Sequence, residues 1–350
     1  TAEWIEQVSS ELHYNDKNLI EKVIRALSLL EMLVKAGCPL VFKGGTALML
    51  ILGKSAHRLS IDIDLICPPG TNIEDYLKSF ADFGFINLEL VERKQRDDAD
   101  IPKSHSKFFY QIAYRNDTDA QSYILLDVLY EDIHYFRTQQ IAINCPFIRL
   151  EGKPLMVTVP SAEDILGDKL TAFAPNTTGI PYYRNGRSCS MEIAKQLYDV
   201  GRLFENVSDL QITKEAFRKI AVVELSYRSF GTDIGQVFND IRQTALCIST
   251  RGKAGEGDFD LIQDGIIRVK SFMYKQRYLI DHAIIDAARA AYLATLIEKG
   301  INEIESYSNN PADIKDMVIR PSLPNKLNKL RSNLPEAYYY WAKTSELLEA

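Results

Sequence analysis

The chain has 350 residues, of which 41 are Lys or Arg and 47 are Asp or Glu, so its formal net charge is −6. Hydrophobic residues make up 46% of the sequence and charged residues 25%, values that exclude a disordered or fibrous protein. The mild acidity argues against a protein coated with basic charge, although a local basic groove stays compatible with it. A chain of this length exceeds the usual size of one hydrophobic core, which predicts two domains.

Cysteine usage and hydropathy predict a cytoplasmic protein with no membrane partner. The five cysteines are scattered and form no CxxC pair, which favours reduced thiols over a disulfide framework. The first ten residues include Glu3 and Glu6 and lack the apolar segment of a signal peptide. The longest apolar run, residues 47–52, is far below the roughly 20 residues that a membrane span needs.

Hydrophobic periodicity predicts a mixture of helices and strands in the first half of the chain. Apolar residues recur every three or four positions over 18–36, which predicts the first helix. Two further helices are expected, over 46–53 and 72–83. Short apolar or alternating runs predict strands at 40–42, 59–66, 84–91, 107–115, 121–130 and 155–159. The charged segment 92–106 is expected to be a long, solvated hairpin loop.

The second half of the chain is predicted to be helical. Ser161 and Asp164 form a start that resembles a capping box, and strand patterns nearly vanish after it. Helices are expected over 162–174, 190–205, 214–228, 232–248, 260–278, 281–299 and 335–349. This change of pattern predicts a domain boundary near residue 158, with an α/β domain over 1–158 and a helical domain over 159–350.

The strand expected at 59–66 carries a candidate metal site. Asp62 and Asp64 share one parity, so their carboxylates leave the same face of the strand about 6–7 Å apart, while isoleucines point to the other face. Two carboxylates this close repel each other unless a cation lies between them, and oxygen ligands suit Mg²⁺. A solvent-facing strand edge is the simpler alternative, but Asp is disfavoured in strands, which favours the metal.

Paired glycines precede the second predicted helix and form a candidate phosphate site. Gly44 and Gly45 let the backbone approach a ligand closely, and the helix N-terminus behind them offers N–H groups and a positive dipole end. The spacing excludes a Walker A or dinucleotide-binding loop. An ordinary turn is the alternative. Asp62 follows Gly45 by 17 residues (62 − 45), which fits one intervening helix and brings phosphate and metal sites to the same end of adjacent strands.

Asp127 is a lone carboxylate in the otherwise apolar strand 121–130. Its unpaired burial would cost several kcal/mol, so it needs a cation or strong hydrogen-bond donors. Two interpretations stay open from the residues alone: a third ligand for the metal of Asp62 and Asp64, or a buried pair with Arg or Lys. The histidines, His105 among them, show no ligand spacing.

Four motifs in order resemble a known family. GGTAL at 44–48, RLSIDIDL at 58–65 and the isolated strand Asp resemble the nucleotidyltransferase fold shared with DNA polymerase β and minimal nucleotidyltransferases. The sequence is most similar to the AbiEii/AbiGii toxin branch, which continues with D-K-L-x-A-F and K-x-x-Y-D, here at 168–173 and 195–199. The resemblance implies an α+β fold, in which a mixed sheet with flanking helices is followed by an all-helical C-terminal domain.

The resemblance also implies roles for individual residues. Those expected to bind the nucleoside triphosphate (NTP) are Gly44, Gly45, Thr46, Arg58, Ser60 and Lys195. The catalytic residues are expected to be Asp62, Asp64, Asp127, Lys169 and Asp199. The first three of these would hold Mg²⁺, or Mn²⁺ in its place, and Lys169 would contact the triphosphate.

Surface ion pairs are the alternative for the two lysines. Lys169 could pair with Asp164 or Glu163 along its helix, and Lys195 with Glu192 or Asp199.

Two clusters of Lys and Arg residues in the helical half each carry a net charge of +4, which suits binding to an RNA phosphate backbone. They span residues 266–277 and 315–331, and a solvated helix face is the alternative for either.

The resulting hypothesis is a Mg²⁺-dependent enzyme that moves NMP from an NTP to RNA, with the tRNA 3′ end as the expected acceptor. The resemblance implies the toxin of a toxin–antitoxin or phage-defence pair, and thus an antitoxin partner. Alternatives are transfer to a protein hydroxyl and a non-catalytic NTP-binding module.

Overall fold

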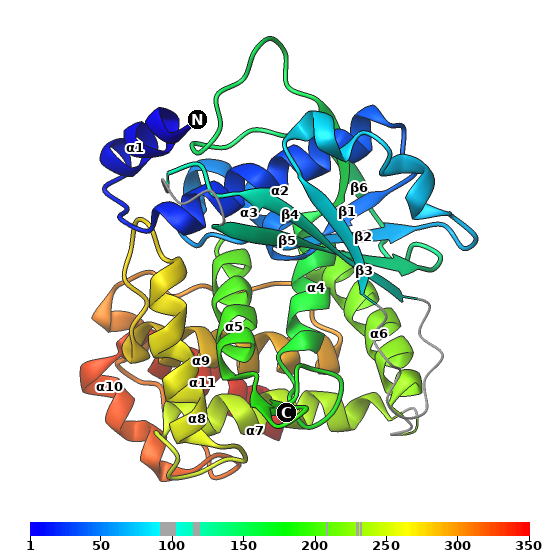
Figure 1. Cartoon of the computed structure of the whole chain (residues 1–350). Helices are drawn as coiled ribbons and strands as arrows, with labels where there is room; N and C mark the ends of the chain where they lie inside the picture. The colour runs from blue at the N-terminus through cyan, green and yellow to red at the C-terminus, as the bar shows by residue number, and fades with distance from the viewer. Residues whose placement is uncertain (92–102, 115–119, 208, 229–230, 232) are drawn as a thin grey trace. The chain divides into compact units, whose positions relative to one another are not determined.

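The computed structural model describes residues 1–91, 103–114, 120–207, 209–228, 231 and 233–350; the others are drawn in grey in Figure 1. The chain divides into two compact units. The first comprises Thr1–Ser161 and Ser271–Arg277, and the second comprises Ala162–Lys270 and Tyr278–Ala350. This division lies three residues after the boundary predicted at 158/159 and returns a short late segment to the first unit. In the described part of the chain, no helix combines the length and apolar character needed to cross a bilayer.

A mixed five-stranded sheet forms the centre of the first unit. Its strands are β1 (Val41–Lys43), β2 (Ile63–Cys67), β3 (Asn87–Val91), β4 (Lys103–Gln111) and β5 (Gln121–Tyr130). The spatial order is β1-β2-β5-β4-β3, in which β2 and β5 run parallel and the other neighbours antiparallel. A separate antiparallel pair consists of β6 (Thr138–Ala142) and β7 (Met156–Pro160).

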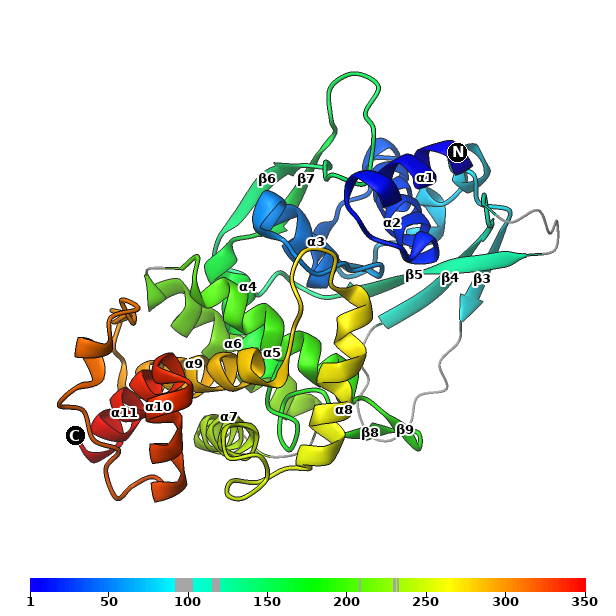
Figure 2. The same cartoon turned by 90° about the vertical axis from the view of Figure 1, so that its left-hand side faces the viewer.

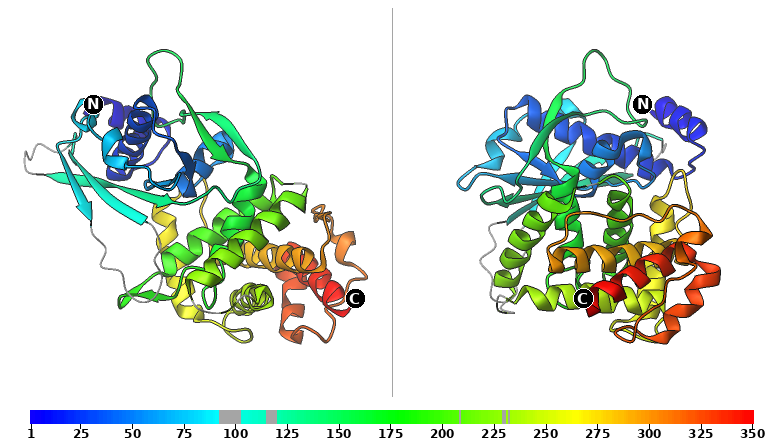
Figure 3. Two further views of the ribbon diagram at one scale, coloured as in Figure 1. Left: turned by 90° about the vertical axis from the view of Figure 1, so that its right-hand side faces the viewer. Right: turned by 180° about the vertical axis from the view of Figure 1, so that it is seen from behind.

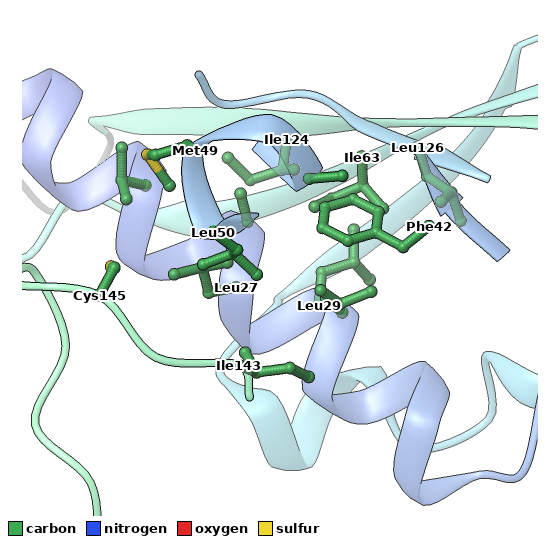
Figure 4. Close-up of a cluster of buried hydrophobic side chains, with 14 of the residues drawn as sticks. Leu27, Leu29, Phe42, Met49, Leu50, Ile63, Ile124, Leu126, Ile143 and Cys145 are labelled. Atoms are coloured by element: carbon green, nitrogen blue, oxygen red, sulfur yellow. The ribbon is translucent and has the colours of Figure 1, made fainter. Parts of the chain in front are cut away.

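Helices cover one face of this sheet. These are α2 (Lys17–Lys35) and α3 (Gly44–Leu52), and α1 (Ala2–Glu11) packs against α2. Figures 1 and 2 show α2 lying across the sheet, and the Asp16 side chain caps its N-terminus by accepting from the N–H of Leu19. Leu27 and Leu29 of α2 pack with Phe42, Ile63 and other apolar side chains in the core (Figure 4). Because alternate residues of β2, β4 and β5 enter this core, the intervening residues lie on the opposite face.

Several boundaries in the first unit differ from the predictions. The strand expected at 59–66 begins only at Ile63, because residues 59–62 are extended but outside the ladder. β4 begins at Lys103 instead of residue 107, so the end of the expected loop 92–106 is strand, and residues 92–102 lie outside the described ranges. Helix α1 and strand β6 are not expected from the sequence.

The helix expected over 72–83 is wrong in type. Two short 3₁₀ helices, Ile73–Tyr76 and Phe80–Phe83, occupy this segment. Ile73 and Leu77 are both buried, as a helical pattern requires, but the turns close through i→i+3 hydrogen bonds, which is common in short connecting segments.

The second unit is helical, which together with the mixed sheet confirms the predicted α+β class. Its helices are α4 (Ala162–Ala172), α5 (Ser190–Phe204), α6 (Leu210–Tyr227), α7 (Ile234–Ser249), α8 (Phe259–Val269), α9 (Ile280–Lys299), α10 (Leu330–Asn333) and α11 (Pro335–Glu349). A two-residue-per-strand hairpin, β8 (Tyr183–Arg184) with β9 (Arg187–Ser188), is a small departure from the all-helical prediction. Figure 3 shows α11, in red, packed beside α9, in orange. The helix expected over 260–278 ends early, at Val269.

A buried charge network joins α5, α9 and α11. Asp286 is 1% exposed and faces two guanidinium groups, at 3.3 Å from Arg289 and 3.5 Å from Arg202. Arg289 also pairs with Glu205 at 2.9 Å and with Glu336 at 2.5 Å. Burial away from water raises the pKa of Asp286 from 3.8 to about 6, and the two arginines offset only part of this rise.

This raised pKa predicts how stability depends on pH. The folded state holds the Asp286 proton more tightly than the unfolded chain, so this group's contribution to the free energy of unfolding falls as pH rises from 3.8 through about 6. Between about pH 5 and pH 7.5 the wild type should lose about 1 kcal/mol more stability than Asp286→Asn. Urea unfolding of both proteins at several pH values measures this difference, and equal losses in the two proteins would contradict it.

Candidate functional site

A row of polar residues crosses the sheet on the face opposite the core. The strand register pairs Lys43 of β1 with Asp64 of β2, Asp64 with Asp127 of β5, and Asp127 with His105 of β4. Residues paired in register point to the same face, and neighbouring strands lie about 4.8 Å apart. The carboxylates of Asp64 and Asp127 are therefore direct neighbours.

Asp127 finds a partner that the sequence did not suggest. Its Oδ1 lies 2.6 Å from Nδ1 of His105, and the two side chains are 34% and 12% exposed. Of the two interpretations left open for Asp127, the one that pairs it with Arg or Lys is thus replaced by a contact with a histidine. Sequence reasoning places His105 in a charged loop; the signal that could have found it is the alternation of Ser106, Phe108 and Tyr110, all buried, which extends the strand backwards with His105 on the outer face.

The absence of a side chain at Gly44 determines where Asp64 can lie. Lys43 ends β1 and is the N-cap of α3, and Gly44 follows with a φ of +79°. A Cβ on Gly44 would lie only 2.1 Å from Oδ2 of Asp64. The carboxylate therefore approaches the first turn of α3 more closely than any side-chain-bearing residue would allow. The predicted helix start at Thr46 is two residues late, because both glycines belong to the helix.

The next two residues of the helix contact the segment before β2. A Cβ on Gly45 would lie 2.8 Å from Oγ of Ser60 and 3.0 Å from a guanidinium nitrogen of Arg58. The Thr46 hydroxyl donates a hydrogen bond to the backbone oxygen of Asp62, at 2.7 Å. All the predicted phosphate-binding residues of the first unit therefore lie around the start of α3. The two aspartates of the DxD motif, Asp62 and Asp64, also lie there.

A segment from late in the chain holds the residues before β2 in place. Within the first unit, Ser271–Arg277 runs beside residues 57–59: Leu59 N–H donates to the oxygen of Phe272 at 2.8 Å, and Tyr274 N–H to that of His57 at 3.0 Å. Arg58 pairs with Met273 between these bonds and is itself only 6% exposed. Its burial indicates that Arg58 packs inside the protein.

The carboxylates do not form a complete cage for a metal. Among the residues that the structure describes, no three His, Cys, Asp or Glu side chains converge as a metal-holding group. Asp64 and Asp127 are neighbours by register, whereas Asp62 lies two residues earlier, outside the ladder. The role of Asp62, Asp64 and Asp127 as metal ligands stays a prediction.

Two predicted catalytic residues of the helical half meet in a buried ion pair. Nζ of Lys169, on α4, lies 3.1 Å from Oδ2 of Asp199, on α5, and the side chains are 9% and 2% exposed. Nζ also donates to Oε1 of Gln196 at 3.0 Å. The D-K-L-x-A-F and K-x-x-Y-D motifs thus join through their charged residues. The alternative pairing of Lys169 with Asp164 or Glu163 is replaced by this contact between helices.

Lys195 is half-buried on α5, four residues before Asp199. Its predicted contact with the nucleoside triphosphate stays a prediction.

The first predicted basic cluster, 266–277, does not form one helix face. Arg268 lies on α8 and pairs with Asp264 at 3.7 Å, whereas Lys275 belongs to the first unit and donates to the oxygen of Lys54 at 2.8 Å. The helix that would have carried the whole cluster ends at Val269, and a short 3₁₀ helix, Lys270–Phe272, follows it.

Arginines of the second cluster, 315–331, are used inside the helical unit. Arg320 lies 3.8 Å from Glu346 and 3.7 Å from Glu349. Arg331 donates to the backbone oxygen of Ile314 at 3.0 Å. These contacts weaken the interpretation of either cluster as a continuous RNA-binding surface.

Comparison with known proteins identifies a family. The sequence profile described as "Nucleotidyl transferase AbiEii toxin, Type IV TA system" matches residues 27–313, which is most of the chain. No curated protein gives a significant match. Among solved structures, JHP933 from Helicobacter pylori is 17% identical and aligns over 82% of this chain and 94% of its own, with a TM-score of 0.42. MenT4, a nucleotidyltransferase toxin from Mycobacterium tuberculosis H37Rv, is 14% identical and aligns over 84% of this chain and 89% of its own, with a TM-score of 0.45.

Gly44→Ala should disrupt the site by displacing Asp64. The new Cβ cannot coexist with Oδ2 of Asp64 at 2.1 Å, so we expect NTP affinity, measured by titration with a fluorescent analogue, to fall by about tenfold or more. Gly37→Ala is the matched control, since Gly37 has a similar φ of +74° and a Cβ added there would meet nothing within 4 Å. Equal losses of affinity in both variants would show that backbone strain alone is responsible.

Lys169→Met should destabilise the helical unit, because it removes the ammonium that faces a buried carboxylate. We expect a loss of about 3–5 kcal/mol in the free energy of unfolding, measured in urea. The double variant Lys169→Met/Asp199→Leu should recover much of this stability, since an apolar pair replaces a buried ion pair at little cost. If NTP affinity stays low in the stable double variant, these residues act on the nucleotide; restored affinity would assign them a structural role alone.

Proposed function

The chain belongs to the AbiEii family of nucleotidyltransferase toxins, which form part of type IV toxin–antitoxin systems, and we propose that it transfers NMP from an NTP to the 3′ end of a tRNA in a reaction that depends on Mg²⁺. The observation that carries this proposal is the juxtaposition of Asp64 with Asp127 and with Gly44 at the start of α3. It supplies neighbouring carboxylates and a helix N-terminus at one edge of one sheet.

The donor set fits a hard divalent cation. Asp64 and Asp127 offer carboxylate oxygens from adjacent parallel strands, and such oxygens are the ligands that Mg²⁺ and Mn²⁺ prefer. Asp62, whose backbone oxygen accepts a hydrogen bond from the Thr46 hydroxyl of α3, would complete the proposed ligand set. Bound there, the cation would lower the pKa of the attacking hydroxyl and neutralise charge on the leaving pyrophosphate.

Residues of the chain itself orient the nucleotide in this proposal. Backbone N–H groups at the start of α3, at Gly44, Gly45 and Thr46, would bind phosphate oxygens, assisted by the positive end of the helix dipole. The Ser60 hydroxyl lies against Gly45 and would extend this phosphate site. Arg58 would support it from behind, since its guanidinium is buried beside Gly45. Positioning and charge stabilisation would supply most of the rate enhancement.

Lys169 and Lys195 would add positive charge for the triphosphate from the helical unit. Lys169 is held by Asp199 and Gln196, so its ammonium has a fixed position. Asp199 would therefore act by positioning Lys169.

The acceptor distinguishes the proposal from its alternatives. RNA is favoured because a toxin that modifies tRNA ends would arrest growth directly, and an antitoxin partner would then relieve the arrest. Transfer to a protein hydroxyl uses the same site and is the alternative acceptor. The family is one of nucleotidyltransferases, which favours catalysis over a non-catalytic NTP-binding module.

One labelling experiment tests these alternatives. Purified protein is incubated with each α-labelled NTP, Mg²⁺, total RNA and cell extract, and products are divided by nuclease and protease treatment. Label in tRNA that disappears in Asp64→Ala supports the proposal, and label in protein supports the alternative acceptor. Asp75→Ala is the control, because Asp75 is 60% exposed and lies in a 3₁₀ turn away from the row of carboxylates. Absence of any product that depends on Asp64 would contradict both forms of transfer.

Metal dependence is tested in the same assay. Removal of divalent cations with a chelator should abolish labelling, and Mg²⁺ or Mn²⁺ should restore it, because two neighbouring carboxylates bind phosphate poorly without a cation between them. Undiminished transfer in the chelator would contradict the metal requirement.

A further inference from the structure

His105 is a member of the polar row that neither the motifs nor the proposed reaction uses. It lies on β4, which pairs with β3 on one side and with β5 on the other. The side chain is 12% exposed, so the surrounding strands limit its movement. The backbone ladder places it directly opposite Asp127.

The contact between the two side chains is short and well defined. Nδ1 of His105 and Oδ1 of Asp127 are 2.6 Å apart. An ionised carboxylate can only accept hydrogen bonds, so Nδ1–H of the imidazole donates and Oδ1 accepts. Hydrogen bonds to a carboxylate are among the stronger ones in proteins, and this one fixes the rotation of the Asp127 side chain.

We propose that His105 is a positioning residue that orients the Asp127 carboxylate toward a divalent cation shared with Asp64. The imidazole holds Oδ1 and so fixes the orientation in which the Asp127 carboxylate would bind the cation. Asp64 reaches the same place from β2, and its own position is restricted by Gly44. Groups that hold a metal ligand in this way commonly change metal affinity by 10–100-fold when removed. The inference rests on the proposed function for the role of Asp127 as a ligand.

Asn and Leu variants at position 105 test the hydrogen bond separately from packing. The two residues have nearly the same shape, and the Asn amide nitrogen can occupy the place of imidazole Nδ1. Both variants remove the same part of the ring, so a purely structural effect would be equal in the two. Their thermal unfolding is measured first, and comparison is made at a temperature where both are folded.

The main readout is the dissociation constant of Mn²⁺ in the absence of nucleotide, measured from the electron paramagnetic resonance signal of the free ion. We expect His105→Leu to weaken Mn²⁺ binding by about tenfold and His105→Asn to stay within about threefold of wild type. In the Asp127→Asn background, His105→Leu should have no further effect, since the two residues act through one contact.

Three results would overturn the inference. They are equal Mn²⁺ affinities in the Asn and Leu variants, an undiminished effect of His105→Leu in the Asp127→Asn background, and no Mn²⁺ binding by the wild type. Parallel measurement of kcat and KM for NTP transfer separates this inference from the proposed function. If the expected pattern of Mn²⁺ affinities is found but the wild type transfers no NMP, the inference stands and the proposed function fails.

Discussion

The pairing register of β1, β2, β5 and β4 is the constraint on which the candidate site depends. It brings Lys43, Asp64, Asp127 and His105 into one row, although they come from four separate parts of the sequence. Side chains alternate between the faces of a strand, so a slip by one residue would turn a member of this row toward the apolar core. Burial of Ile63 and Leu65 in β2, and of Leu126 and Val128 in β5, prevents such a slip. The hydrophobic core thus determines where the polar groups meet.

The same row is fixed at its edge by two close approaches. Asp64 lies against Gly44, and the segment before β2 is bonded on one side to Thr46 of α3 and on the other to residues 271–277. The second contact joins positions more than two hundred residues apart in sequence, so the residues just before β2 are held by a part of the chain that no local sequence pattern indicates.

Periodic elements and local motifs could be predicted from the sequence, but the partners of charged residues could not. Helices α2, α5 and α11 and strand β5 lie within about two residues of their predicted bounds, because their hydrophobic periods are long and regular. His105 escapes prediction because the charged residues before it hide the alternation of β4. The sequence suggests a partner for Lys169 on its own helix, since spacing along one helix is readable, whereas Asp199 reaches it only through packing of α4 against α5. Segment 271–277 is predicted as part of a helix for the same reason: the residues to which it bonds, 57–59, lie elsewhere in the sequence.

Carboxylates of the two units have different neighbours. In the helical unit Asp199 faces Lys169, and Asp286 faces Arg289 and Arg202, so the protein supplies the positive charge. On the sheet, Asp64 and Asp127 face each other across about 5 Å, where repulsion is about 3 kcal/mol at an effective dielectric constant of about 20. Lys43 is paired with Asp64 in the strand register, and the imidazole of His105 contacts Asp127. In the proposed function, a divalent cation between Asp64 and Asp127 would relieve this repulsion and so favour binding of a nucleotide that carries its own metal.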